Sequence, residues 1–263
     1  MTEIQLATGQ FITTLAILIQ NGVRYATSID LGSADGNFNL ALMHNYGFLP
    51  GATCVNVDAN ALYEPSLREI QRVAGGHYLI AGISDHDGEI ELQMGMHSDW
   101  ASLQPPDDPY WVIPGYPPTK STKVRAVTLD TLVQEFALKP PFLLKLDLQG
   151  GELAALRGGE KMLAQTDTVI CESAPDQFPA VCEYLNSRNL GLFDLTQISR
   201  KPDGSLMEFY PVFLNRRLDH IKYKDQMGPE GIRALIAAME QRRNAILEQN
   251  ARMLSRLRTK ASQ

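Results

Sequence analysis

From residue 25 onwards, short apolar segments alternate with stretches of helical periodicity. This alternation is typical of a parallel sheet with helices on both faces. The segments predicted as strands are Thr27–Leu31, Thr53–Val57, His77–Ser84, Phe142–Asp147 and Thr168–Glu172. The segments predicted as helices are Asn37–Asn45, Leu62–Val73, Gly151–Ala164 and Asp176–Arg188. The pattern therefore predicts an α/β fold with a doubly wound sheet.

The two flanks of this pattern differ from its centre. Residues 3–22 contain the apolar run Phe11–Ile19, which is too short to span a bilayer and predicts an N-terminal helix on the core. Leu192–Ile198 and Met207–Leu214 surround a turn rich in Pro and Gly, which predicts an antiparallel hairpin at the end of the sheet. We therefore expect an N-terminal helix within residues 1–24, a sheet domain over 25–217 and a C-terminal helix over 228–260.

The predicted C-terminal helix carries apolar residues at intervals of three and four. They are Ile232, Ile236, Met239, Ile246, Met253 and Leu257. Arg243 and Asn250 fall on the same stripe, and a single Asn at such a position fixes the register of paired helices. An amphipathic helix folded back on its own domain is the alternative. We expect a coiled coil here that makes a homodimer.

Residues 94–120 interrupt the alternation of strands and helices. Six prolines exclude a continuous helix or a central strand there; they are Pro105, Pro106, Pro109, Pro114, Pro117 and Pro118. The segment also contains Trp100, Trp111 and Tyr116, and bulky aromatic residues are normally placed where they pack or bind. We predict a long irregular insertion that forms a lid or a substrate wall, with a plain surface loop as the alternative.

Composition narrows the class of protein. The 263 residues are 44% hydrophobic and 21% charged, which suits one soluble globular domain with short appendages. The net charge of -6 provides no general attraction to phosphate backbones or anionic lipid, so we expect neither nucleic acid nor a membrane as partner. Three widely separated cysteines, Cys54, Cys171 and Cys182, suit reduced thiols and a cytoplasmic location.

The first predicted strand leads into the loop Asp30–Gly36. Gly32 and Gly36 allow the tight turn that close approach of a ligand requires, but their spacing lacks the G-x-G-x-x-G pattern of nicotinamide-binding folds. Asp30 and Asp35 would repel a pyrophosphate and favour a cationic ligand. Ser33, between the two glycines, is also a candidate for cofactor binding. The loop stands at the carboxyl edge of the sheet, where open α/β sheets bind ligands.

S-adenosylmethionine matches this loop in charge. It carries a sulfonium and an ammonium group, and its carboxylate can accept hydrogen bonds from backbone N–H groups. Asp58 follows the second strand, where doubly wound nucleotide folds place an acid that accepts hydrogen bonds from the ribose hydroxyls. Ser84 and Asp85 close the third strand and are candidates for the adenine edge, with an Asx turn as the alternative.

Two groups of residues resemble known methyltransferases. Residues 28–37, S-I-D-L-G-S-A-D-G-N, resemble motif I of class I methyltransferases. Residues 127–132 (V-T-L-D-T-L), 144–153 (L-K-L-D-L-Q-G-G-E-L) and 156–158 (L-R-G) resemble the FkbM methyltransferase family. The similarity extends over about residues 25–215 and implies a Rossmann-like, seven-stranded sheet that ends in a hairpin. It also implies S-adenosylmethionine as cofactor and methyl transfer, usually to oxygen, on sugars or secondary metabolites.

The resemblance also implies roles for single residues. Asp30, Gly32, Asp35 and Gly36 would surround the methionine part of the cofactor, Asp58 the ribose, and Ser84 and Asp85 the adenine. Asp147 would lie near the transferred methyl group. The insertion at 94–120 and the C-terminal tail match less clearly, so the acceptor, expected to be a small molecule, is not identified.

A hydroxyl acceptor must lose its proton, which requires a general base or a metal. The candidates are Asp147 after the fourth strand, Glu172 at the end of the fifth, and His97 in the insertion. Alternatively, Asp147 caps a helix, Glu172 pairs with Lys145 or Arg157, and His97 is a solvated loop residue. No third ligand for a metal is evident, so we expect metal-free catalysis. The rival functions are N-methyl transfer, a nicotinamide-dependent oxidoreductase and a non-catalytic cofactor-binding or oligomerisation module.

Overall fold

The structure is a computed structural model. It describes residues 9–95, 97, 101–107, 118–222, 233, 236, 237, 239–241, 243 and 244. The chain divides into two compact units, Met1–Ile221 and Lys222–Gln263. The first unit contains both sheets and the cavity described below.

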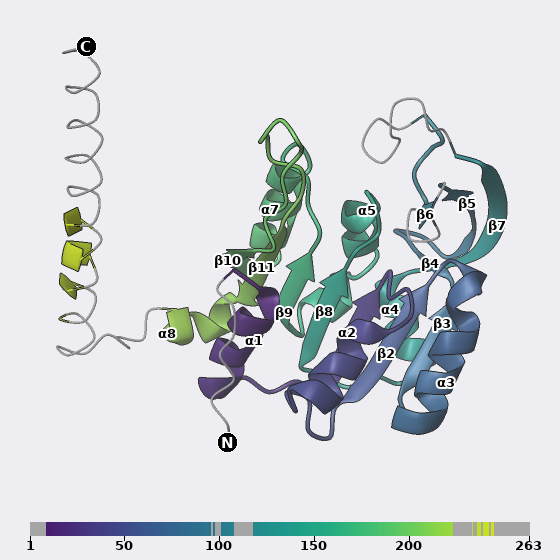
Figure 1. The fold of residues 1–263 in the computed structure, drawn as a ribbon. Helices are drawn as coiled ribbons and strands as arrows, with labels where there is room; N and C mark the ends of the chain where they lie inside the picture. Colours follow the sequence, from purple (N-terminus) through teal and green to yellow (C-terminus); the bar gives the residue numbers. More distant parts are fainter. Residues whose placement is uncertain are drawn as a thin grey trace, which may run out of the picture. The chain divides into compact units, whose positions relative to one another are not determined.

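Seven strands form the central sheet (Figure 1). They are β1 (Thr27–Leu31), β2 (Thr53–Asp58), β3 (His77–Ile80), β8 (Phe142–Leu146), β9 (Thr166–Cys171), β10 (Leu190–Thr196) and β11 (Tyr210–Asn215). Their order is β10-β11-β9-β8-β1-β2-β3, and β11 runs antiparallel to both of its neighbours. The predicted doubly wound, seven-stranded sheet with a terminal hairpin is confirmed.

Helices cover both faces of this sheet. On one face lie α1 (Phe11–Gln20) and α2 (Asn37–Leu40), which continues into a π-helical turn, Ala41–Asn45; α3 (Glu64–Ala74) packs beside β3. On the other face lie α4 (Leu129–Glu135), α5 (Glu152–Arg157), α6 (Glu160–Leu163) and α7 (Phe178–Ser187). A short helix, α8 (Asp219–Lys222), follows β11.

The pleat of the strands explains the two cores. Ile29, Leu144 and Val169 belong to the core beneath α4–α7, whereas Leu143 and Ile170, one position away, belong to the core beneath α1 and α2. Successive side chains of a strand point to opposite faces, so a strand covered on both faces is apolar throughout. The continuous apolar strands of the sequence are thereby accounted for.

The chain forms a second sheet after β3. It has four strands in the order β4-β7-β5-β6: β4 (Gly82–Ile83), β5 (Gly88–Met94), β6 (Ala101–Ser102) and β7 (Lys120–Val127). The prediction of one strand over His77–Ser84 is therefore wrong, because the chain leaves the first sheet at Ala81 and pairs Gly82 with Ala126 of β7. The insertion predicted over 94–120 contains one short strand, since Ala101 pairs with Met94, and residues 96, 98–100 and 108–117 lie outside the described residues.

Glycines also divide a predicted helix. The helix expected over Gly151–Ala164 is two helices, α5 and α6, separated at Gly158 and Gly159. A β-carbon on Gly158 would collide with the backbone carbonyl of Ser84, and one on Gly159 would press on Leu129. The two glycines between α5 and α6 therefore let the backbone approach closely both Ser84, which follows β4, and Leu129 of α4.

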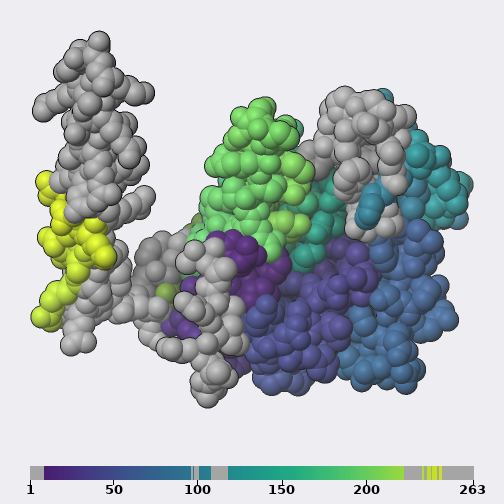
Figure 2. Space-filling model, in the orientation of Figure 1, coloured from purple at the N-terminus to yellow at the C-terminus, as the bar shows by residue number. Residues whose placement is uncertain are grey.

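The hairpin β10–β11 projects beyond the surface of α1. In the space-filling view its green residues rise above the purple residues of α1 (Figure 2). Three apolar side chains of the hairpin, Leu195, Ile198 and Met207, are exposed there. The hairpin also carries Tyr210 at the start of β11, and Tyr210 lines the cavity of this unit.

The two predicted terminal helices are only partly described. The N-terminal helix runs from Phe11 to Gln20, and residues 3–8 lie outside the described residues. Within 228–260, the eight described residues are helical and exposed, but Asn250 and the rest of the heptad pattern lie outside them, as does the basis for the expected homodimer. No helix of the described part of the chain is long and apolar enough to cross a membrane.

Candidate active site

A cavity of about 300 Å³ lies at the carboxyl ends of the central strands. Gly32, Asp58, Asp147 and Glu172 line it from the first sheet. The second sheet and the residues directly after β6 form the opposite wall, through Ile83, Leu92, Ala101 and Leu103. None of the described residues that line the cavity is cationic. The cavity thus combines an acidic side and an apolar side.

The loop after β1 can take its path only with glycine at two positions. Gly32 has φ +67°, and a β-carbon there would collide with the carbonyl oxygen of Asp147. Its N–H donates to the carbonyl of Val57 at 2.9 Å. Gly36 has φ +82°, and a β-carbon would press on Ile70 at 2.6 Å. Such positive φ values are strained for any other residue. The loop is therefore packed tightly between β2 and β8.

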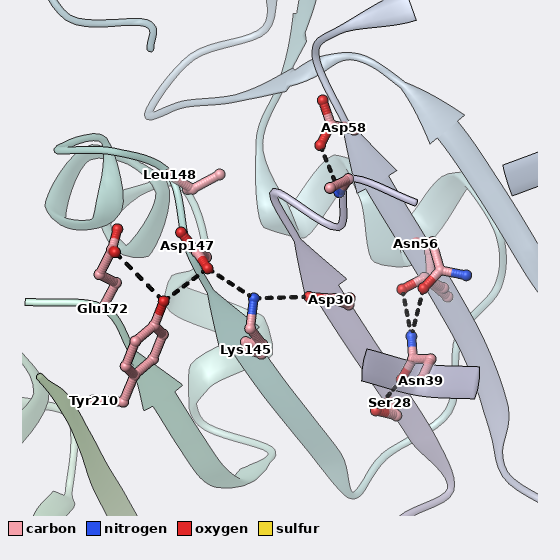
Figure 3. A network of polar contacts seen from close by, with 12 residues as sticks. Ser28, Asp30, Asn39, Asn56, Asp58, Lys145, Asp147, Leu148, Glu172 and Tyr210 are labelled. Atoms are coloured by element: carbon pink, nitrogen blue, oxygen red, sulfur yellow. Dashed lines mark hydrogen bonds and ion pairs between the residues drawn. The ribbon is translucent and has the colours of Figure 1, made fainter. Parts of the chain in front are cut away.

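Asp58 joins the loops after β1 and β2. One carboxyl oxygen accepts a hydrogen bond from the N–H of Ala34 at 2.8 Å (Figure 3). The other accepts one from the N–H of Asn60, also at 2.8 Å. Burial raises the pKa of Asp58 to about 6 even though both hydrogen bonds lower it. Each carboxylate oxygen retains a lone pair, so Asp58 can still accept hydrogen bonds from a ligand in the cavity.

A buried lysine lies beneath the cavity between two aspartates. The Nζ of Lys145 donates to Asp30 at 3.2 Å and to Asp147 at 3.3 Å (Figure 3). Burial lowers the pKa of Lys145, but the charges of Asp30 and Asp147 outweigh it, so the net shift is upward. Burial raises the pKa of Asp30, and Lys145 partly opposes this. The lysine is therefore charged, and it joins the two central strands, β1 and β8.

Asp147 and Glu172 form a carboxyl pair at the ends of β8 and β9. Tyr210 donates its hydroxyl to Asp147 at 2.9 Å and lies 3.4 Å from Glu172. The amide of Gln149 donates to both carboxyls, at 3.2 Å and 2.9 Å. Burial and the nearby charge of Asp147 raise the pKa of Glu172 to about 10. Burial opposes ionisation of Asp147, yet Lys145 and Tyr210 lower its pKa overall. At neutral pH the pair therefore holds one proton, on Glu172.

Glu152 at the start of α5 orders the loop that carries Gln149. One oxygen of Glu152 accepts hydrogen bonds from the N–H of Leu148 at 2.7 Å and of Gly150 at 3.4 Å. The other oxygen is buried and has no hydrogen-bond partner among the described residues. Burial raises the pKa of Glu152 to about 7. Gln149 itself has a positive φ of 50°, which this loop conformation imposes.

The structure brings together four of the predicted site residues. Gly32, Asp58, Asp147 and Glu172 all line the cavity. Asp30 lies deeper, fully buried against Lys145, because its side chain points to the face covered by α2. Ser33 and Gly36 are buried in the loop, and the hydroxyl of Ser33 has no partner among the described residues.

Four predicted site residues lie elsewhere. Asp35 is exposed at the outside of the loop and accepts a hydrogen bond from Asn37. Ser84 and Asp85 do not line the cavity, because the chain enters the second sheet at Gly82 and Ile83 is the last residue of β4 at the cavity. Asp85 instead pairs with the neighbouring His86. His97 lines a second cavity beside β5 and β7, not the cavity of Asp147.

Two residues of the site were not proposed for it from the sequence, Lys145 and Tyr210. Lys145 precedes Asp147 by two positions in the K-L-D segment, so its proximity to Asp147 is a signal that was available. Tyr210 has no such signal, because antiparallel pairing brings it to Glu172 from a distant part of the chain. Among the described residues, no group of three His, Cys, Asp or Glu side chains could hold a metal ion.

The comparison with protein families finds one match. The model of the methyltransferase FkbM domain matches residues 30–191. This range contains the glycine loop, Asp58, Asp147 and Glu172. No curated protein matches the chain.

Solved structures with a similar fold are methyltransferases of diverse kinds. A precorrin-6y C5,15-methyltransferase from Geobacter metallireducens is 9% identical, with 81% of this chain and 92% of that chain covered and a TM-score of 0.42. An rRNA methylase from Streptococcus thermophilus is 11% identical, with 80% and 98% covered and a TM-score of 0.42. A putative O-methyltransferase from Nostoc punctiforme is 14% identical, with 78% and 56% covered and a TM-score of 0.35.

The prediction that excluded nucleic acid as a partner is wrong. It rested on the net charge of -6, and the net charge of a whole chain does not determine what one local surface binds. Methylases of rRNA and a methyltransferase solved in a protein complex are among the solved structures similar to this chain.

Proposed function

The chain belongs to the FkbM methyltransferase family, and we propose that it transfers a methyl group from S-adenosylmethionine to a hydroxyl of a sugar or secondary metabolite. The observation that carries this proposal is the carboxyl pair Asp147–Glu172, which lines the same cavity as Asp58. A hydroxyl needs a proton acceptor beside it during methyl transfer. An amine acceptor needs less help from a base, so a built carboxyl pair favours oxygen over nitrogen.

The lining of the cavity fits the proposed cofactor. Asp58 has free lone pairs for ribose hydroxyls, and Ala81, Ile83 and Leu92 offer an apolar surface for adenine. The ionised Asp147 suits the cationic methionine end. A nicotinamide dinucleotide fits less well, because its pyrophosphate would meet carboxylates and no cationic lining residue in the described part of the cavity. We therefore assign Gly32 and Asp58 to cofactor binding.

The chemistry expected of the chain is mainly alignment and proton transfer. The sulfonium of the cofactor supplies an activated methyl group. The protein must hold the acceptor hydroxyl in line with it and exclude water. Asp147 and Glu172 receive the hydroxyl proton as a coupled pair. Because Glu172 carries a proton at neutral pH, with a pKa of about 10, the pair becomes a better base as the pH rises.

Calorimetric titration tests the cofactor assignment. We expect S-adenosylmethionine and its demethylated product to bind and NAD to bind at least tenfold more weakly. Asp58→Ala should weaken binding of both sulfur compounds by roughly tenfold or more, since buried hydrogen bonds to the ribose are lost. Asp176→Ala, at an exposed aspartate after β9, is the matched control. Tight NAD binding without binding of the sulfonium compound would refute the proposal.

Methyl transfer from isotopically labelled cofactor tests the acceptor class. Hydroxyl-bearing sugars and metabolites, amines and RNA are offered in parallel, and the label is located by mass spectrometry. We expect label on oxygen of a small molecule, with turnover rising from neutral to alkaline pH. Label on nitrogen, or only on RNA, would replace the proposed acceptor while leaving the cofactor assignment intact.

A further inference from the structure

We propose that Tyr210 is a positioning residue of the catalytic centre, whose hydroxyl stands between Asp147 and Glu172 and fixes which of them holds the proton they share. This inference rests on the proposed function, in which the carboxyl pair takes the acceptor's proton. Tyr210 lies outside the segment that matches the family model, residues 30–191. The residue is therefore supplied by a part of the chain that family motifs do not describe.

The antiparallel strand β11 places Tyr210 opposite Glu172. The pairing of β11 with β9 runs from Leu214↔Thr168 to Val212↔Ile170, and the bridge Ser173↔Phe209 continues it in the same register. Tyr210 and Glu172 thus stand directly across from each other. Opposite residues of an antiparallel pair project their side chains to the same face. The hairpin topology therefore brings the phenol to the carboxyl pair.

The hydroxyl of Tyr210 has the geometry of a bridge. It lies 2.9 Å from Oδ2 of Asp147 and 3.4 Å from Oε1 of Glu172 (Figure 3). A phenol has one proton to donate and can also accept one hydrogen bond. It donates to the nearer, ionised Asp147, and its oxygen can accept from the protonated Glu172. This arrangement favours the proton on Glu172 over the proton on Asp147.

Aromatic packing holds the ring of Tyr210 in place. Its centroid is 5.9 Å from that of Phe11 in α1, and Phe11 meets Phe38 of α2 edge-on at 5.7 Å. The Nζ of Lys145 lies 5.8 Å above the Phe38 ring. A phenylalanine at position 210 would keep these ring contacts and lose only the hydroxyl. Tyr210→Phe is therefore a substitution that tests the hydroxyl and retains the packing.

The titratable groups around the pair come from each element packed against it. They are Asp30 from β1, Asp58 from β2, Lys145 from β8, Glu152 from α5, Cys171 from β9 and Glu208 before β11. Burial and the two neighbouring carboxyls raise the pKa of Tyr210, so the phenol remains a neutral donor over the working pH range. Lys145 and Gln149 also donate to Asp147, which means that Tyr210 is one of three donors that keep this carboxyl ionised.

Carbon-13 NMR of protein labelled at the Asp and Glu carboxyl groups tests the inference without any acceptor. In the wild type we expect Asp147 to be ionised and Glu172 protonated at neutral pH. In Tyr210→Phe, loss of the donor to Asp147 should raise the apparent pKa of Asp147 and lower that of Glu172, so that the two titrations approach each other by about one unit. Tyr184→Phe, which removes a hydroxyl bonded to the Leu156 carbonyl, should leave both titrations unchanged.

Kinetics give the second readout. Tyr210→Phe should lower kcat by about tenfold while the Kd for S-adenosylmethionine stays within twofold. Adding Glu172→Gln should abolish the effect of Tyr210→Phe, because residues acting through one group are not additive. Unchanged carboxyl titrations in Tyr210→Phe would overturn the inference even if methyl transfer is found. Altered titrations without any methyl transfer would instead uphold the role of Tyr210 in the pair and refute the proposed function.

Discussion

Carboxyl groups at one edge of the sheet differ in their state because their partners differ. Asp147 has donors on both oxygens and is ionised, whereas Glu172, one strand away, has a pKa raised to about 10. Asp58 accepts hydrogen bonds from two backbone N–H groups and has a pKa of about 6. Environments that separate the pKa values of neighbouring acids allow one of them to carry a proton and another a charge. The acid–base assignment of this site follows from that separation.

Glu152 is the residue whose titration should be visible in the stability of the fold. It is 1% exposed, with a pKa raised from 4.5 to about 7. A folded pKa above the unfolded one favours the protonated, folded form, so this contribution is complete below about pH 4.5 and is lost as the pH rises through about 7. The shift corresponds to roughly 3 kcal/mol at about 1.36 kcal/mol per pKa unit.

The prediction is that Glu152→Gln removes this pH dependence. The free energy of unfolding, measured by urea denaturation, should fall with pH less steeply between about 4.5 and 7 in the variant than in the wild type, by up to roughly 3 kcal/mol. The glutamine oxygen can still accept from the N–H of Leu148. Glu183→Gln, at an exposed position of α7, is the control. Parallel curves for wild type and Glu152→Gln would show that Glu152 ionises as freely in the folded protein as in the unfolded one.

Residues at strand ends were predictable from sequence, and residues that face the site across the hairpin were not. Asp58 and Asp147 follow apolar strands directly, so the carboxyl-edge rule places them at the cavity. Ser84 and Asp85 satisfy the same rule in the sequence, because they end the apolar segment predicted as the third strand. The rule failed there because the chain changes sheets at Gly82, and no local pattern distinguishes a strand that continues from one that leaves its sheet.

At the scale of elements, the connection from β1 to α2 is the part of the fold most sensitive to a single added carbon. Gly32 lies where a β-carbon would meet the backbone of Asp147, which cannot rotate out of the way as a side chain can. The same connection is held to β2 by the N–H groups of Gly32 and Ser33, which donate to Val57. The position of Asp147 at the cavity therefore depends on the packing of this turn.

Gly32→Ala should therefore disable the cavity and destabilise the fold. A positive φ alone costs an alanine about 1–2 kcal/mol, and the collision with Asp147 adds to that cost. Gly204→Ala is the matched control, since Gly204 has φ +86° and open space where the β-carbon would go. Thermal unfolding and calorimetry with S-adenosylmethionine are the measurements. We expect a larger loss of Tm and of affinity for Gly32→Ala, and equal losses for the two variants would contradict the packing argument.

Periodicity located the helices and the buried strands well and the second sheet poorly. The strand Thr27–Leu31 agrees with the prediction residue for residue, because a strand buried on both faces has a continuous apolar pattern. The strands β5 and β7 of the second sheet are half-exposed and rich in Glu, Lys and Thr, and neither was predicted from the sequence. Their pairing partners lie about 30 residues apart, as in Leu92↔Thr122, a distance at which single-sequence patterns carry no information on pairing.

At the scale of the whole molecule, the cavity belongs to both sheets of the first unit. The acidic side comes from the seven-stranded sheet, and the apolar side comes from β4, β5 and β6. Two hydrogen bonds join the apolar wall to the loop after β8. Ser102 donates to the carbonyl of Gln149 at 2.7 Å, and Gln104 donates to the carbonyl of Gly150 at 3.1 Å. A ligand that fills the cavity would therefore contact both walls, and the loop that carries Gln149 lies between them.

Hydrogen exchange should reveal this linkage between the two sheets. Binding of demethylated S-adenosylmethionine at saturating concentration should slow amide exchange in β5 and in residues 101–104, as well as at the ends of β1, β2 and β8, because a ligand that binds only the folded form suppresses local opening on both sides of the cavity. The Asp58→Ala variant at the same ligand concentration should show less protection in both regions, since it loses affinity. Protection confined to the seven-stranded sheet would mean that the ligand does not reach the second wall, and the assignment of the apolar side to adenine would then be wrong.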